Sequence, residues 1–230
     1  MVRVPHSPRA FKCLLTAVVF LVWTGGCGPV PSDPLERAAF DGDAARVAAL
    51  TAAGQSRSPH AFGALIWACR QGRVDAIATL LNRGVDPNRH DDRLGWTPLM
   101  HALHKHQAAA ARLLLDRGAD PRIGTASYSP IEMAALDDDA DLVARMLTAG
   151  IARDQLARAI EIAVSGGALV DIDRALFGSC KTQTVRVLLA ADPALRADVS
   201  AGLLSSRWWA ARQGCDGTLR LLAAATNGEQ

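Results

Sequence analysis

The sequence predicts an all-α fold, a solenoid of stacked helix-turn-helix units joined by short hairpin loops. Half of the 230 residues are apolar but only 5% are aromatic, and this composition favours close-packed helices over a β-sandwich. A pattern of about 33 residues also recurs along the chain, and the glycines that end its copies, at positions 54, 84, 118 and 150, lie 30, 34 and 32 residues apart. One such unit cannot bury its own apolar face, so neighbouring units must stack.

Residues 95–120 carry the clearest copy of the pattern, GWTPLMHALHKHQAAAARLLLDRGAD. Thr97 is suited to cap the first helix, and Pro98 costs no hydrogen bond in its first turn. The apolar run Leu113–Leu115 gives the second helix a face to bury. Gly118 can adopt the left-handed conformation that ends a helix. The pattern therefore predicts two short helices in each unit.

Further copies occupy residues 34–54, 63–86, 129–150 and 206–225. The pattern resembles the ankyrin repeat, which has a TPLH-x-A-A segment, a helix break, a V-V-x-LLL segment and a terminal GAD. The resemblance runs from Asp33 to about Thr226, and it implies an ankyrin-repeat domain of about six units over residues 35–227.

The fifth unit, residues 153–192, departs from this pattern. It contains three helix-like stretches, DQLARAIEIAV, VDIDRALF and TQTVRVLLAA, where a plain unit has two. We expect an insertion of roughly ten residues between Val164 and Cys180, since insertions in repeat proteins fall between helices. The register of the helices within this unit stays open at the level of sequence.

The N-terminus has the features of a targeting segment. Residues 1–12 include three basic residues and no acidic one, and an apolar run of 11 residues, CLLTAVVFLVW, follows at 13–23. As a helix this run spans roughly 16 Å, about half of the hydrocarbon core of a bilayer. A signal peptide is therefore favoured over a membrane-spanning helix, with a short buried helix as the alternative.

Thr24-Gly25-Gly26-Cys27 follows the apolar run and resembles a bacterial lipobox. The resemblance implies a lipoprotein-type signal peptide at residues 1–26, acylation of Cys27 and a tether over residues 27–34. More than one acyl chain is needed for stable attachment to a membrane. Thr24 departs from the Leu or Val that the motif prefers, so ordinary secretory cleavage is the alternative. The choice between inner and outer membrane stays open.

Charge and motifs argue against nucleic-acid binding and catalysis. Three of the 25 basic residues lie in the targeting segment, which leaves 22 basic against 23 acidic residues and no basic footprint for nucleic acid. The sequence has no G-x-S-x-G nucleophile elbow and no phosphate-binding glycine loop. The acidic run Asp137–Asp139 is typical of a solvated turn. We therefore expect neither an enzyme nor a cofactor.

Three histidines form the one cluster with metal chemistry. His101 and His104 share a face of the predicted helix, and His106 lies near its end. Imidazoles at this spacing can bind zinc or copper, although no cysteine or carboxylate at ligand spacing completes the set. Packing or contact with a partner is the favoured interpretation of these side chains.

Cys180 and Cys215 fall at nearly equivalent helix breaks in successive units. A disulfide between them is a candidate, because an envelope compartment permits disulfides and stacked units lie near the distance limit of about 7 Å between Cα atoms. Cys69 stands at an alanine position of the pattern and is expected to be a small buried residue.

Phe62, Trp96 and Tyr128 precede the TPLH-like segment in three consecutive units. The resemblance places this position on the hairpin, facing the concave groove where partners of ankyrin proteins dock, and aromatic residues are common at interface hot spots. The alternative is that they cover the ends of neighbouring helices. Other variable positions line the same groove and would suit an acidic protein surface: Arg70, Gln71, Arg93, His104, Lys105 and Leu136.

These expectations combine into a protein-binding module, lipid-anchored on the periplasmic side of a bacterial envelope, that captures a protein partner on its concave face. Two alternatives stay open. One is an immunity protein that neutralises a toxic effector, and the other is a metal-binding envelope protein that uses its histidines.

Overall fold

The computed structural model describes residues 30–51, 58–165, 180–192, 194–195 and 206–223. The elements of this part of the chain are helices, with no strand among them, which confirms the predicted fold class. They form six pairs: α2 (Pro34–Asp41) and α3 (Ala44–Leu50), α4 (Pro59–Gln71) and α5 (Val74–Asn82), α6 (Pro98–His104) and α7 (Ala108–Asp116), α8 (Pro130–Ala134) and α9 (Ala140–Leu147), α10 (Arg153–Ser165) and α11 (Thr182–Ala191), α13 (Ser206–Arg212) and α14 (Asp216–Ala223).

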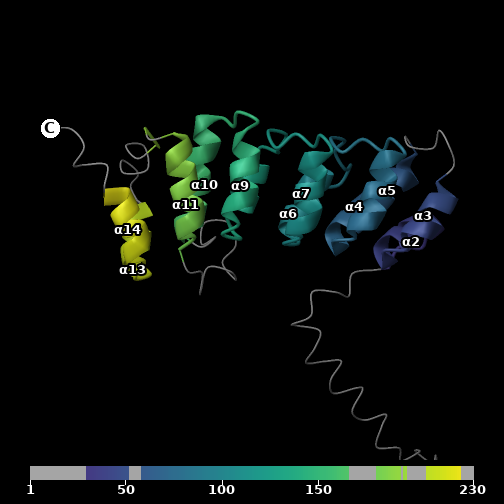
Figure 1. Ribbon diagram of the computed structural model, residues 1–230, viewed down its shortest axis with the longest axis horizontal. Helices are drawn as coiled ribbons and strands as arrows, with labels where there is room; N and C mark the ends of the chain where they lie inside the picture. The colour runs from purple at the N-terminus through teal and green to yellow at the C-terminus, as the bar shows by residue number, and fades with distance from the viewer. Residues whose placement is uncertain (1–29, 52–57, 166–179, 193, 196–205, 224–230) are drawn as a thin grey trace, which may run out of the picture.

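The pairs lie side by side in chain order, as Figure 1 shows. The first helices of the pairs contact one another in the series α2, α4, α6, α8, α10, α13. The second helices form a parallel series, α3, α5, α7, α9, α11, α14. We call these two series the first-helix layer and the second-helix layer. Because each helix contacts mainly its neighbours, the layers form an elongated slab.

Short polar residues and prolines start the first helices. The carboxylate of Asp33 accepts hydrogen bonds from the N–H groups of Leu35 and Glu36 at 2.9 and 3.0 Å, so α2 begins at Pro34, one residue before the predicted domain start. The hydroxyl of Ser58 accepts from the N–H of Ala61 at 3.1 Å. Both caps precede a proline at the first position of the helix, where its missing N–H costs nothing.

The turn between the two helices of a pair repeats one hydrogen bond. The N–H of Arg73 donates to the carbonyl of Ala68, and the N–H of Gln107 donates to that of Ala102, both at 2.9 Å. Both alanines are fully buried. Their methyl groups let adjacent first helices pack closely, so the turn and the packing depend on the same residue.

The fifth unit uses the same turn across an insertion. The N–H of Lys181 donates to the carbonyl of Ala163 at 2.9 Å, but these residues are 18 apart in the sequence where Ala68 and Arg73 are five apart. The insertion is therefore thirteen residues, somewhat longer than expected. DQLARAIEIAV lies in α10 and TQTVRVLLAA forms α11, which resolves the register, while VDIDRALF lies outside the described residues.

Cys180 and Cys215 form a disulfide with their Cα atoms 6.0 Å apart. The bridge joins the helix turn of the fifth pair to that of the sixth, 35 residues along the chain. Cys69 is fully buried in α4, and its burial raises the pKa of the thiol. The two bridged cysteines therefore fasten the last unit, and Cys69 belongs to the core.

Removing the bridge is expected to destabilise the C-terminal units. A cross-link over 35 residues stabilises the folded state by about 4 kcal/mol, chiefly by restricting the unfolded chain. Urea unfolding followed by circular dichroism should show this loss for the Cys180→Ser/Cys215→Ser variant and for reduced wild-type protein. The Cys69→Ala variant, as a control, should keep its response to reductant. Equal stability of the oxidised and reduced protein would contradict the role of the bridge.

Candidate protein-binding surface

Four aromatic side chains gather where α6 meets the hairpins on either side of it. The rings of Trp96 and Tyr128 pack edge to face with their centroids 6.2 Å apart. The indole of Trp96 also lies 5.4 Å from the His101 ring and 5.1 Å from the His104 ring. We call these four residues the aromatic cluster. His101, at the base of the cluster, is buried, Trp96 and Tyr128 are half-buried, and His104 is exposed. The cluster is therefore packed against the protein on one side and accessible to solvent on the other.

Asp91 holds the hairpin that carries Trp96. Its carboxylate accepts hydrogen bonds from the N–H groups of Arg93 and Leu94 at 3.1 and 2.5 Å. Its other oxygen lies 2.5 Å from Nε2 of His101. The N–H of Asp91 donates to the carbonyl of Trp96 at 2.9 Å. Asp91 thus fastens both ends of the loop and connects the loop to α6, which fixes the position of the indole.

His101 is neutral in this environment. Burial lowers the pKa of His101 and outweighs the opposing effect of Asp91, while the positive charges of Arg70 and Lys105 lower it further. For Asp91, burial raises the pKa, but the hydrogen bonds from Leu94 and His101 together bring it below its ordinary value. Asp91 is therefore a carboxylate, and the neutral imidazole donates its Nε2 hydrogen to it.

Two arginines near the cluster lie against aromatic rings. The guanidinium carbon of Arg70 is 4.8 Å from the centroid of Trp67, and that of Arg89 is 4.5 Å from the centroid of Phe62. Such contacts place a guanidinium over the face of a ring, and the N–H donors at the edges of the guanidinium can still form hydrogen bonds.

The structure corrects the expected place of Phe62. It lies inside the first turn of α4 and is only 6% exposed, because Ser58 and Pro59 start the helix before the position that the repeat pattern indicates. Phe62 therefore belongs to the buried core, and of the three aromatic residues Trp96 and Tyr128 remain half-buried at the surface. Gln71 ends α4, and both it and Leu136 are half-buried.

The three histidines do not gather into a metal site. His101 is paired with Asp91, and Nδ1 of His106 is paired with the carboxylate of Asp137. Within the described residues, the one group whose ligand atoms lie within 4.8 Å of one another is Asp33, Glu36 and His60. There Nδ1 of His60 lies 3.4 and 3.3 Å from the two carboxylates, so ion pairing accounts for that grouping.

Sequence reasoning missed three contributors to this surface, Trp67, Arg89 and Asp91. Trp67 contributes through its contact with Arg70 in the same helix, and Arg89 through its contact with Phe62 of α4. A repeat pattern does not reveal such contacts. Asp91 carries a weak local signal, since aspartate often accepts hydrogen bonds from the N–H groups that follow it in a turn. That signal does not indicate its contact with His101.

The predicted signal peptide and Cys27 lie outside the described residues. None of the helices in the described part of the chain is long and apolar enough to cross a membrane.

Comparisons with known proteins agree with this architecture. Residues 35–125 match the family described as ankyrin repeats, in three copies. The crystal structure of the human ASB11 ankyrin repeat domain superposes with a TM-score of 0.61 at 23% identity, covering 86% of this chain and 85% of that one. Residues 35–125 therefore match ankyrin repeats, and the chain has the ankyrin-repeat fold.

Curated relatives share only part of the chain. The 2-5A-dependent ribonuclease of Mus musculus is 42% identical over 57 residues, which are 25% of this chain and 8% of that protein. The mitochondrial disaggregase of Bos taurus is 39% identical over 84 residues, which are 36% of this chain and 12% of that protein. The chain thus matches about a tenth of the length of these relatives.

The neutral state of His101 predicts a pH-dependent stability. Because the pKa of His101 is lower in the folded protein than its ordinary value of 6.5, stability is complete above pH 6.5 and falls as the pH drops toward the folded-state pKa. For Asp91, whose pKa is lowered from its ordinary value of 3.8, the corresponding loss of stability lies below pH 3.8. Urea unfolding at several pH values should show the decrease in wild-type protein.

The His101→Gln variant tests the assignment, because glutamine can still donate a hydrogen bond to Asp91 but does not titrate. It should lose most of the pH dependence that the wild-type protein shows as the pH falls below 6.5. The His90→Gln variant changes an exposed histidine and should keep the wild-type slope. An unchanged slope in the His101→Gln variant would contradict the assignment.

Proposed function

We propose that this ankyrin-repeat chain is a non-enzymatic protein-binding module that captures a protein partner on its concave face, at the first-helix layer and its hairpins. The observation that carries the proposal is the aromatic cluster. Tryptophan and tyrosine bury a large area at a small entropic cost, and together with arginine they dominate interface hot spots. Here they stand on adjacent units, half-buried and surrounded by basic side chains.

The hairpin supports this function by pre-organising the cluster. Asp91 makes hydrogen bonds to four positions of the loop, Arg93 to Trp96, and pairs with His101. A loop that is already ordered loses less conformational entropy when a partner binds, so more of the contact energy remains as affinity.

We place the module on the periplasmic side of a bacterial envelope, held there by acylated Cys27. The basic segment, the apolar run of 11 residues and the small residues before Cys27 support this placement. α2 begins seven residues after Cys27, and an extended tether of that length reaches about 24 Å. The solenoid would therefore stay close to the bilayer surface. An immunity protein is a special case of this function in which the captured partner is a toxic effector.

Photo-crosslinking tests capture. A photoreactive amino acid at position 105, beside the cluster, should crosslink a protein partner in cells, whereas one at position 186 on α11 in the second-helix layer should not. The Trp96→Ala/Tyr128→Ala variant is expected to weaken capture at least about tenfold, as loss of hot-spot residues does. Phe62 is left unchanged because truncating a buried ring would open a cavity. Equal crosslinking from both positions, or full capture by the double variant with intact helical content, would refute the proposal.

Fractionation tests the anchor. The wild-type protein is expected in the membrane fraction with an acylated N-terminal cysteine at position 27, measured by mass spectrometry of the intact chain. The Cys27→Ser variant should lose that mass and most of its membrane association, while the Cys69→Ala variant should keep both. A mature chain without acyl mass would favour ordinary secretory cleavage instead.

A further inference from the structure

Four basic side chains border the aromatic cluster without a carboxylate partner. The ion pairs of the described residues include none of them. Two come from the ends of first helices and two from the hairpin that Asp91 holds. We call the set the basic border: Arg70, Arg89, Arg93 and Lys105.

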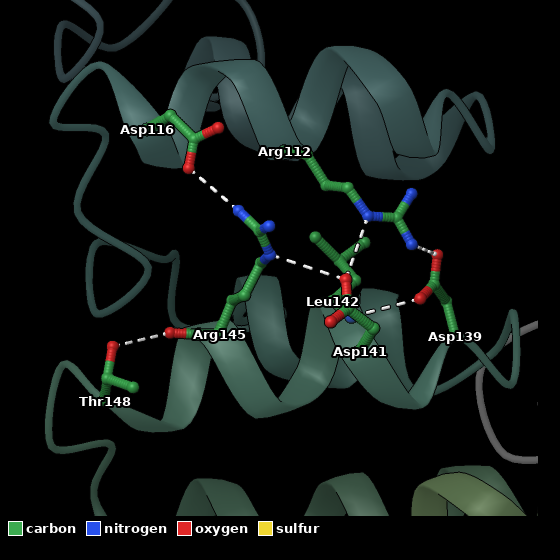
Figure 2. A network of polar contacts seen from close by, with 7 residues as sticks. All are labelled: Arg112, Asp116, Asp139, Asp141, Leu142, Arg145 and Thr148. Carbon is green, nitrogen blue, oxygen red and sulfur yellow. Dashed lines mark hydrogen bonds and ion pairs between the residues drawn. The ribbon is translucent and has the colours of Figure 1, made fainter.

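In the same part of the molecule, two arginines of the second-helix layer form ion pairs with aspartates. Figure 2 shows Arg112 of α7 reaching the carboxylates of Asp139 and Asp141 at 2.5 and 3.2 Å. Arg145 of α9 lies 2.8 Å from Asp116 and 3.4 Å from Asp141. The dashed contacts join α7 to α9 and neutralise both arginines. The positive charge of the basic border has no such internal counterpart.

Some acidic groups near the basic border are already paired with histidines, and few others are exposed. Asp91 is paired with His101, and Asp137 is paired with His106. Asp86 and Asp92 are exposed in the segment between α5 and α6. Together with Asp91, whose partner His101 is neutral, they place three negative charges against the four cations, so this face keeps a small excess of positive charge.

The positive charge of the basic border affects the pKa of a buried residue, His101. Burial is the main cause that lowers the pKa of His101, and the charges of Arg70 and Lys105 lower it further. Both cations therefore act on the base of the aromatic cluster. A carboxylate placed beside them from outside would reduce their mutual repulsion.

Two cations of the basic border lie at different positions along the length of α4. Arg89 contacts Phe62 near the start of α4, and Arg70 lies one residue before the end of that helix at Gln71. From Phe62 to Arg70 the helix α4 rises about 12 Å, which is the length of about four residues of extended chain. A short extended segment therefore covers the distance between the cations.

We infer that the partner presents an acidic, extended protein segment, whose carboxylates meet Arg70, Arg89 and Lys105 while its apolar side chains contact Trp96 and Tyr128. The inference deepens the proposed function and rests on it. Arginine suits this task because its planar guanidinium can bind a carboxylate through two hydrogen bonds. Charge complementarity of this kind mainly sets specificity and the rate of association.

Fluorescence anisotropy with defined probes tests the inference on the whole chain. The probe is a labelled peptide of about eight residues in which glutamate alternates with leucine. It should bind wild-type protein at least tenfold more tightly than the matched lysine-leucine peptide, and higher salt should weaken its binding, because salt screens exposed charges. The Arg70→Glu/Arg89→Glu/Lys105→Glu variant should bind it at least tenfold more weakly.

A matched triple variant controls for net charge. Arg46, Arg186 and Arg220 are exposed in the second-helix layer, and they too take part in no ion pair of the described residues. Changing all three to glutamate alters the net charge equally and should leave affinity for the acidic peptide within about twofold. Equal losses in the two triple variants would overturn the inference, because binding would then follow overall charge.

A single-stranded oligonucleotide of the same negative charge is the competing probe. Binding of this probe as tight as that of the acidic peptide would overturn the inference in favour of a polyanion site. Absence of acidic-peptide binding would also overturn it, while crosslinking of a partner from position 105 would leave the proposed function intact. Peptide binding without any crosslinked partner from position 105 would instead support the acidic-segment inference and contradict the proposed capture of a protein partner.

Discussion

The close approach of the first helices depends on one small buried side chain in each unit, and the rest of the slab follows from it. In α4 and α6 this residue is Ala68 or Ala102, and its carbonyl also accepts the hydrogen bond that turns the chain into the second helix. A larger side chain there would separate neighbouring first helices, since packed interiors tolerate added volume poorly. One alanine thus sets both the turn within a unit and the spacing between units. The fifth unit shows how strong this constraint is, because Ala163 keeps the same bond although the chain leaves for an insertion before it returns at Lys181.

The two layers use charge for different purposes. In the second-helix layer, Arg112 and Arg145 join α7 to α9 through aspartates of their own and neighbouring units. Exposed ion pairs contribute little stability one by one, but in a solenoid each lies on an interface between neighbours, where stability is decided. Around α4 and α6, the hairpins and first helices instead hold aromatic rings and cations, and two guanidinium groups rest on rings. Further along the first-helix layer, Arg158 of α10 pairs with Glu132 of α8. Stability between units is therefore shared by the core, the second-helix layer and this pair, which leaves the hairpins beside α6 free to carry a candidate binding surface.

Local signals explain why the sequence predicted the fold so well. Caps, prolines, buried alanines and terminal glycines each act within a few residues, so their pattern defines the units without knowledge of contacts. Phe62 was misplaced for the same reason, because the pattern gave its repeat position while Ser58 and Pro59 decided where the helix begins. The pairing of His101 with Asp91 depends on the path of a hairpin in space, and the contact of Arg89 with Phe62 joins two units. Repeat periodicity contains neither contact. The surface could therefore be located from the sequence, but its organisation could not.

The placement of Asp91 decides the character of that surface. A carboxylate in the middle of a basic and aromatic face would ordinarily repel an acidic partner and attract the neighbouring cations. Here its oxygens are occupied by two backbone N–H groups and by the imidazole of His101, so its charge is engaged within the hairpin. The same contacts keep Trp96 in place, while burial keeps His101 neutral against the opposing effect of Asp91. The residue that orders the loop thus also holds its own negative charge within the loop, so the order of the hairpin and the reduced exposure of that charge follow from a single set of hydrogen bonds.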